Sequence, residues 1–280
     1  MANPRFKLPP ATLSSIAQKQ ARNHLAKIGI LSASLDSQLL LAHSLGLTKS
    51  KLATSEDRSL TDNQIKNFEV LINQRAKNQP LAYLTKKLEF AGLEFFVDPR
   101  VLKPRTETEI IIEKLIQELA PNSRVLDLGT GSGNLAISLK YHRPDLNVTG
   151  SDYSVEALEV ARINQARLIP NQDIDWRVSD IFDQFSSKKF EAIVANLPYL
   201  PDGIEVMPET NFEPAIALFG GKTGLELYQK MFESISQYLS PGAVVWIESD
   251  RWQQPDLENL ALKSGLRVYY QDYFITGFRN

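Results

Sequence analysis

The chain has no cysteine among its 280 residues. This absence excludes disulfide bonds, thiol catalysis and cysteine-ligated metals, and it fits a cytoplasmic protein. Histidine is scarce as well, because only His24, His43 and His142 occur. These three residues are too scattered along the sequence to predict a metal cluster, so we expect no metal site.

Long apolar runs are also missing. No stretch approaches the roughly 18 consecutive apolar residues that indicate a membrane span, and the first ten residues lack the apolar core of a secretory signal. The overall composition, with 43% hydrophobic and 23% charged residues, is that of an ordinary globular protein. We therefore expect a cytoplasmic protein without a membrane partner, formed from one large domain or two smaller ones.

Charge is divided unevenly along the chain. Residues 1–85 carry 11 Lys or Arg against 5 Asp or Glu, whereas residues 86–280 carry 20 against 28. The basic first part fits an acidic partner surface or RNA, and it fits solvated helix faces equally well. The acidic second part argues against a nucleic-acid groove there, because phosphate binding requires clustered Lys and Arg.

Hydrophobic periodicity predicts a small all-α domain over residues 1–85. Two amphipathic helices are expected, the second beginning with Thr61 or Asp62 as its N-cap. Their apolar faces are Leu35, Leu39, Leu40 and His43 in the first, and Ile65, Phe68, Leu71 and Ile72 in the second. Residues 86–100 predict a β-hairpin linker that turns at Ala91 and Gly92.

From residue 101 to residue 280, strand and helix patterns alternate. Thr106 and Glu109 have the spacing of a capping box, which indicates the start of a helix. The expected strands cover 124–127, 147–151, 176–179, 190–195 and 243–248, and the expected helices cover 134–141, 154–166 and 225–239. Such alternation predicts an α/β fold with a parallel sheet and helices on both faces.

Three glycines follow the first of these strands. Gly129, Gly131 and Gly133 lie between a strand and a helix, where glycine permits a tight turn and close approach of a ligand. The helix that follows presents its N-terminal N–H groups to an anion. A dinucleotide fingerprint would place its third glycine at position 134, which is Asn134, and the loop lacks the lysine of a P-loop.

Acidic residues follow three expected strands. Asp127 precedes the glycine loop, and Asp152 ends the next strand, where a carboxylate can accept hydrogen bonds from both hydroxyls of a ribose. Asp180, followed by the apolar Ile181, comes after the third strand and suits an adenine amino group. This ordered set resembles the S-adenosylmethionine-dependent methyltransferases of Rossmann-like fold.

The tetrapeptide Asn196-Leu197-Pro198-Tyr199 follows a strand expected to be buried. The Asn196 carboxamide and the Leu197 carbonyl can accept the two hydrogen bonds of a substrate NH2 group, and Pro198 fixes the turn. Tyr199 can stack on a planar group. These groups suit methyl transfer to a flat amino group, which leaves both the exocyclic amine of adenine and the amide of glutamine as acceptors.

Over nearly its whole length, the chain resembles the release-factor N5-glutamine methyltransferase family. The matching segments are 80–85, 89–95, 97–102, 125–134, 152–158, 212–214, 217–218, 220–221 and 224–225. General adenine methyltransferases are not expected to share the hairpin or the segment 212–225. The resemblance implies methylation of the glutamine in the Gly-Gly-Gln motif of peptide chain release factors, with residues 1–85 docking the release factor.

The resemblance also implies a role for each site residue. Asn196, Pro198 and Tyr199 would be catalytic, and together with Leu197 they would bind the glutamine amide. The residues expected at the S-adenosylmethionine are Asp127, Gly129, Thr130, Gly131, Ser132, Gly133, Asp152, Asp180, Ile181 and Asn196. The chain departs from the family pattern at Leu197 and Thr106, where the family usually has proline. The alternative function is that of an N6-adenine methyltransferase acting on DNA or RNA.

Overall fold

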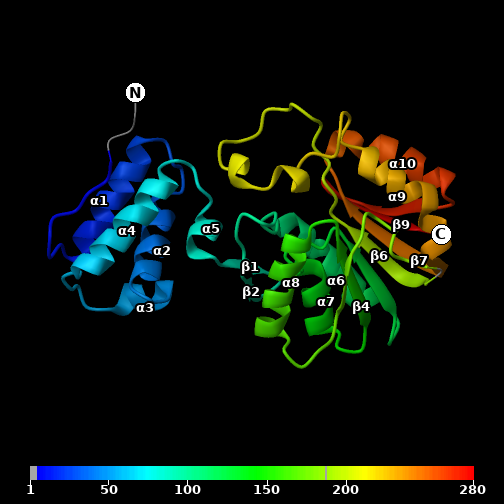
Figure 1. Ribbon diagram of the computed structural model, residues 1–280, viewed down its shortest axis with the longest axis horizontal. Helices are drawn as coiled ribbons and strands as arrows, with labels where there is room; N and C mark the ends of the chain where they lie inside the picture. The colour runs from blue at the N-terminus through cyan, green and yellow to red at the C-terminus, as the bar shows by residue number, and fades with distance from the viewer. Residues whose placement is uncertain (1–4, 187) are drawn as a thin grey trace. The chain divides into compact units, whose positions relative to one another are not determined.

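The computed structural model describes residues 5–186 and 188–280, which divide into two compact units (Figure 1). The helical unit comprises the chain up to Lys86 together with the short segment Met207–Phe212. The sheet unit comprises Lys87–Val206 and Glu213–Asn280. The chain therefore leaves the sheet unit after Val206, contributes six residues to the helical unit and returns at Glu213.

Five helices build the helical unit within its described residues. They are α1 (Ser14–Lys27), α2 (Ala33–Ser44), α3 (Lys49–Thr54), α4 (Asp62–Arg75) and α5 (Leu81–Thr85). Thr61 is the N-cap of α4 and forms a full capping box with Gln64, which settles the prediction of Thr61 or Asp62 as the cap. Ile65, Phe68 and Ile72 are buried as predicted.

The predicted apolar face of α2 is wrong at His43, which is exposed, and at Leu35, which is 43% exposed, whereas the neighbouring Asp36 is 2% exposed. Asp36 points inward because its carboxylate accepts a hydrogen bond from the buried Arg75 at 2.6 Å. Arg75 also pairs with Glu209 of the segment Met207–Phe212 at 3.2 Å. A long-range ion pair thus rotates the inward face of α2 by one position.

The sheet unit begins with the predicted hairpin. Strands β1 (Leu88–Phe90) and β2 (Leu93–Phe95) pair antiparallel, as expected from the sequence. The two turn residues Ala91 and Gly92 have φ angles of 48° and 75°. Positive φ at both positions is the conformation that matches the twist of a two-residue hairpin.

Behind the hairpin lies a sheet that has seven strands within the described residues, in the order β5-β4-β3-β6-β7-β9-β8. Neighbours from β5 to β7 run parallel, and β9 runs antiparallel to β7 and β8. The strands are β3 (Arg124–Leu128), β4 (Asn147–Asp152), β5 (Asp175–Val178), β6 (Phe190–Ala195), β7 (Leu239–Glu248), β8 (Arg267–Gln271) and β9 (Ile275–Arg279).

Helices cover both faces of this sheet (Figure 1). Leu126 and Leu128 of β3 pack in one cluster with residues of α9 and α10, whereas Val125 packs in another with α6 and α7. The helices are α6 (Glu109–Glu118), α7 (Asn134–His142), α8 (Val155–Leu168), α9 (Glu226–Ser234) and α10 (Gln254–Lys263). Burial of both strand faces is what a parallel sheet requires, and the predicted α/β fold is confirmed.

Three local predictions need correction. Thr106 and Glu109 form no capping box, because Thr106–Thr108 is a 3₁₀ turn and α6 begins only at Glu109. The helix expected over 225–239 ends at Ser234 and continues as a 3₁₀ turn, and β7 starts at Leu239 instead of residue 243.

Within the described residues, no helix is both long enough and apolar enough to span a bilayer.

The buried ion pair of the helical unit makes a stability prediction. Replacing Asp36 by Ala leaves the Arg75 guanidinium buried with its closest partner removed, which should cost about 3–5 kcal/mol of unfolding free energy. Glu56→Ala, at an exposed position of the same unit, should change stability by no more than about 0.5 kcal/mol.

Urea unfolding followed by far-ultraviolet circular dichroism measures this difference. Tryptophan fluorescence supplies an internal control, because Trp176, Trp246 and Trp252 all belong to the sheet unit. A cost for Asp36→Ala as small as that of Glu56→Ala would mean that Glu209 alone is a sufficient partner for Arg75.

Candidate active site

The strand register brings the predicted site residues to one edge of the sheet. Leu128 of β3 pairs with Ser151 of β4 on one side and with Ala195 of β6 on the other. The next residues, Gly129, Asp152 and Asn196, therefore lie at neighbouring carboxyl ends, where the strand order reverses. Ligands of open α/β sheets bind at this switch point.

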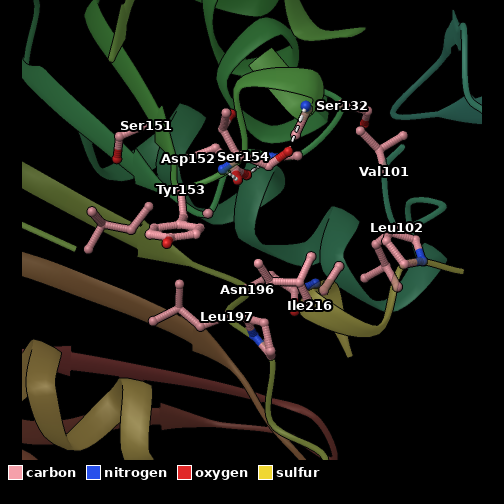
Figure 2. Close-up of a pocket in the computed structure, with 18 of the residues that line it drawn as sticks. Val101, Leu102, Ser132, Ser151, Asp152, Tyr153, Ser154, Asn196, Leu197 and Ile216 are labelled. Carbon is pink, nitrogen blue, oxygen red and sulfur yellow. Dashed lines mark hydrogen bonds between the residues drawn. The ribbon is translucent and has the colours of Figure 1, made fainter. Parts of the chain in front are cut away.

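A cavity of about 420 Å³ opens at this edge (Figure 2). Figure 2 shows Asp152 and Ser154 on one side of it and Asn196, Leu197 and Ile216 on the other. Of the predicted site residues, the lining includes Asp127, Gly129, Thr130, Gly131, Ser132, Asp152, Asp180, Ile181, Asn196, Leu197 and Pro198. Gly133 and Tyr199 lie outside the lining.

The glycines of the loop differ in what a side chain at each position would contact. Gly129, Gly131 and Gly133 all have positive φ angles, of 70°, 55° and 80°. A Cβ atom on Gly129 would come within 2.9 Å of the Leu197 side chain, so this glycine lets the loop and the tetrapeptide approach each other. A Cβ atom on Gly133 would instead meet Ile137, Ala161 and Trp176, which is a packing role.

Asp127 is buried beneath the glycine loop. Its Oδ2 atom accepts hydrogen bonds from the Thr130 hydroxyl at 2.5 Å and from the Ala136 N–H at 3.1 Å. Its Oδ1 atom has no partner among the described residues. Burial raises the pKa of Asp127 from 3.8 to about 7. Asp127 thus favours the folded state most below pH 3.8, and this contribution is lost as the pH rises to about 7.

Asp152 is held by the backbone around it. Its two oxygens accept the N–H groups of Gly131 at 2.9 Å and Ser154 at 2.8 Å. Burial raises the pKa of Asp152, and these N–H donors oppose the rise. Each oxygen of a carboxylate has a second lone pair, so Asp152 can still accept hydrogen bonds from a ligand.

Asp180 and Ile181 also line the cavity. The Asp180 carboxylate pairs with Lys230 at 2.8 Å, an interaction that the sequence did not indicate. Ile181 is buried and has a φ angle of 51°, an unfavourable conformation for a β-branched residue. The Ser179 hydroxyl donates to its carbonyl at 3.0 Å and stabilises this turn. Such strain in a well-packed site is typical of ligand-binding positions.

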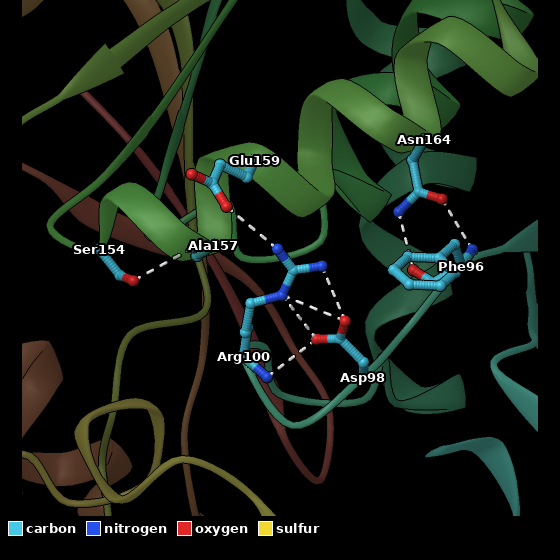
Figure 3. Close-up of polar contacts among 7 residues, drawn as sticks. All are labelled: Phe96, Asp98, Arg100, Ser154, Ala157, Glu159 and Asn164. Atoms are coloured by element: carbon cyan, nitrogen blue, oxygen red, sulfur yellow. Dashed lines mark hydrogen bonds and ion pairs between the residues drawn. The ribbon is translucent and has the colours of Figure 1, made fainter. Parts of the chain in front are cut away.

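The wall formed by Arg100, Val101, Leu102 and Pro104 was not predicted. It is anchored to α8 through polar contacts (Figure 3). Arg100 pairs with Asp98 at 2.7 Å and with Glu159 at 3.1 Å, and the Asn164 carboxamide bonds both backbone groups of Phe96. The contacts with Glu159 and Asn164 join residues 59 and 68 positions apart, so no local pattern could reveal them.

A buried tyrosine holds the backbone of the tetrapeptide by a hydrogen bond. The Leu197 N–H donates to the Tyr228 hydroxyl at 3.2 Å, and that hydroxyl in turn donates to the backbone carbonyl of Glu248. Proline at position 197 would lack this N–H. Leu197 departs from the family pattern, in which proline is usual. Its backbone is restrained by a hydrogen bond, whereas the ring of a proline would restrain the φ angle directly.

A second segment packs against the backbone of Pro198 and Tyr199. A Cβ atom on Gly220 would lie 2.2 Å from the Pro198 carbonyl oxygen, and one on Gly224 would lie 2.1 Å from that of Tyr199. Leu200 forms an isolated parallel bridge with Phe219. These glycines permit the close approach that fixes the tetrapeptide, which gives the segment 212–225 a structural role in the site.

Glu248 is the other unpredicted residue at this edge. Its carboxylate is buried and accepts hydrogen bonds from the Thr108 hydroxyl and from the Tyr199 hydroxyl at 3.4 Å. Burial raises the pKa of Glu248, and the Thr108 and Asn196 donors oppose the rise. Nearby, the buried Glu213 carboxylate pairs with Arg105 at 2.9 Å.

Two family models match the chain. The PrmC N-terminal domain matches residues 17–85, and the methyltransferase small domain matches residues 105–209. Among solved structures, a methyltransferase from Pyrococcus furiosus superposes with a TM-score of 0.51 at 20% identity, covering 67% of this chain and 88% of that one. At this identity, the likeness shows the Rossmann-like methyltransferase fold alone.

Named relatives extend over most of the chain. The release factor glutamine methyltransferase of Geobacter sulfurreducens is 34% identical over 230 residues, which covers 81% of this chain and 80% of that protein. That of Leptospira interrogans is 41% identical and covers 72% of this chain and 73% of its own length. A bifunctional methyltransferase of Rickettsia conorii is 32% identical over 89% of this chain, which spans 53% of that longer protein.

The brace beneath the tetrapeptide can be tested by Tyr228→Phe. The substitution leaves the buried Leu197 N–H without its acceptor, so it should lower the unfolding free energy by about 1–3 kcal/mol. Tyr141→Phe removes a hydroxyl from a side chain that is 45% exposed and should leave stability nearly unchanged. Thermal and urea unfolding of both variants measure the difference. Equal stabilities would show that the Leu197 N–H does not depend on Tyr228.

Proposed function

The chain belongs to the release factor glutamine methyltransferase family, and on this premise we propose a specific reaction for it. The protein transfers a methyl group from S-adenosylmethionine to the side-chain amide nitrogen of the glutamine in the Gly-Gly-Gln motif of a peptide chain release factor. One observation carries the proposal: Asn196, Leu197 and Pro198 line the same cavity as the glycine loop and Asp152. Cofactor and acceptor groups thus converge at one point.

The cavity residues fit S-adenosylmethionine chemically. The orphaned Oδ1 of Asp127 suits the ligand's ammonium group, because a buried oxygen without a donor gains most from a charged one. The free lone pairs of Asp152 suit the ribose hydroxyls, and the buried Ile181 offers an apolar wall to the adenine. We assign cofactor contacts also to Gly129, Thr130, Gly131 and Ser132, with Asp180 near the adenine amino group and Gly133 supporting the loop from behind.

When bound, S-adenosylmethionine supplies an electrophilic methyl group. The protein must then activate an amide nitrogen, which is a poor nucleophile because its lone pair is delocalised. The Asn196 Oδ1 atom and the Leu197 carbonyl accept hydrogen bonds from the substrate NH2 group, orient it and offset the positive charge that develops on nitrogen. Pro198 holds this turn, and Tyr199 supports it from outside the cavity lining.

The remaining parts of the chain receive roles on the same premise. Residues 1–85 form the domain that docks the release factor, residues 86–100 form the hairpin linker, and residues 101–280 form the methyltransferase domain. The excess of basic residues in the first part, 11 against 5 acidic ones, suits an acidic partner surface. The reaction takes place in the cytoplasm, and nucleic acid is neither the acceptor nor a required partner.

Mass spectrometry with methyl-labelled S-adenosylmethionine tests the function. In separate reactions the protein receives a release factor, adenine-containing DNA or adenine-containing RNA, and the label should be found only on the Gly-Gly-Gln glutamine. Asn196→Ala should lower turnover by about 10²–10³-fold, whereas Asn171→Ala, at an exposed position of the same unit, should not. Label on adenine, or a fully active Asn196→Ala variant, would refute the assignment.

The buried acid makes a separate prediction about cofactor binding. Because the pKa of Asp127 is about 7 without a cation beside it, an approaching ammonium group should lower that pKa and release a fraction of a proton near pH 7. Calorimetric titration with S-adenosylmethionine in buffers of different ionisation enthalpies counts the protons. Asp127→Asn should remove this share of the release, and an unchanged proton count in that variant would exclude Asp127 as the cation's partner.

A further inference from the structure

The Asn196 carboxamide has a buried acid, Glu248, as its neighbour on the next strand. Ala195 of β6 pairs with Ile247 of β7, so the parallel register sets Asn196 beside Glu248 at the two strand ends. The Asn196 side chain acts on Glu248 as a hydrogen-bond donor that lowers the pKa of this acid. The strand register, and not the conformation of a loop, brings the two residues together.

An amide side chain can be placed in two ways that differ by exchange of its oxygen and its NH2 group. An ionised carboxylate can only accept hydrogen bonds, so it pairs with the NH2 end of Asn196 and turns the oxygen away from itself. Without such a partner, both orientations would be open to Asn196. Only one of them offers Oδ1 to an amino group in the cavity.

Burial raises the pKa of Glu248, and the donors and the cation around its carboxylate oppose that rise. The Thr108 hydroxyl donates to Oε2 and the Tyr199 hydroxyl donates to Oε1 at 3.4 Å. The Arg105 guanidinium adds a favourable charge, which the Glu107 carboxylate partly opposes. With donors on both oxygens, Glu248 is fixed in direction, and a fixed acceptor can impose one orientation on its neighbour.

We propose that Glu248 is a positioning residue, which fixes the Asn196 carboxamide so that Oδ1 faces the substrate amino group. This inference rests on the proposed function and adds to it the group that selects the active orientation of Asn196. Glu248 touches neither substrate nor cofactor in this scheme, and it does not line the cavity. It acts on the reaction only through Asn196.

A four-member set of proteins tests this: the full-length wild type, Glu248→Gln, Asn196→Ala and the double variant. Glu248→Gln keeps the shape of the side chain but presents an NH2 group as well as an oxygen, so both orientations of Asn196 become possible. We expect kcat to fall by about 10–10²-fold, in the range of losing one charge-assisted hydrogen bond. The KM for S-adenosylmethionine should stay unchanged.

The turnover of the double variant decides whether Glu248 acts through Asn196. If Glu248 acts only through Asn196, the double variant should be no slower than Asn196→Ala alone in single-turnover assays. Multiplication of the two single defects would overturn the inference, because Glu248 would then serve the reaction or the fold independently. A kcat for Glu248→Gln equal to that of the wild type would overturn it as well.

Ser249→Ala is the matched control on the same strand end. Ser249 is fully buried, and its hydroxyl has no partner among the described residues, so its loss should leave kcat unchanged.

If Glu248→Gln does not fold, Glu248→Asp takes its place in the set, because it keeps the charge but withdraws the carboxylate from Asn196. A wild type that fails to methylate the release factor would refute the proposed function itself, whereas an active wild type with independent defects refutes only the role of Glu248.

Discussion

The parallel register of β3, β6 and β7 is the constraint on which the site depends. Leu128 opposite Ala195, and Ala195 opposite Ile247, place Gly129, Asn196 and Glu248 side by side at the carboxyl ends of the three strands. Because ladder hydrogen bonds fix the register at these ends, a site built on them shares the stiffness of the sheet. The glycine loop and the tetrapeptide need only short extensions beyond their strands to meet Glu248, which is how a site keeps its groups within fractions of an ångström.

The same strand register brings three buried carboxyl groups to one edge of the sheet. Burial raises the pKa of Asp127, Asp152 and Glu248, and each of them is compensated differently. Backbone N–H groups hold Asp152, and side-chain donors hold Glu248, so both have their hydrogen bonds within the fold. Asp127 keeps one oxygen without a partner among the described residues. Buried polar groups are normally satisfied, and Asp127 lines the cavity, so this open oxygen is the observation that supports the proposed contact with the cofactor's ammonium group.

Local patterns in the sequence were enough for the fold and for the cavity's main loops. Strand and helix alternation, and the glycines that need positive φ, are properties of short segments, so a single sequence can indicate them even where it misplaces an end of an element. Leu35, Asp180 and Glu248 show where this approach stops. Asp36 turns inward because of Arg75, Asp180 meets Lys230, and Glu248 meets Thr108 across 140 positions. Each pairing is decided by tertiary contacts, for which a single sequence gives no periodic signal.

At Leu197, where the family usually has proline, long-range contacts restrain the backbone in place of the proline ring. A proline restrains its own backbone through its ring, and it needs no partner to do so. Leucine gains an N–H donor in exchange, and this donor reaches the Tyr228 hydroxyl, which is anchored in turn to the carbonyl of Glu248. Tyr228 comes from α9, so the stiffness of the tetrapeptide here depends on the packing of that helix against the sheet. The position of the Leu197 carbonyl therefore depends on the packing of the whole unit, since no proline ring secures it.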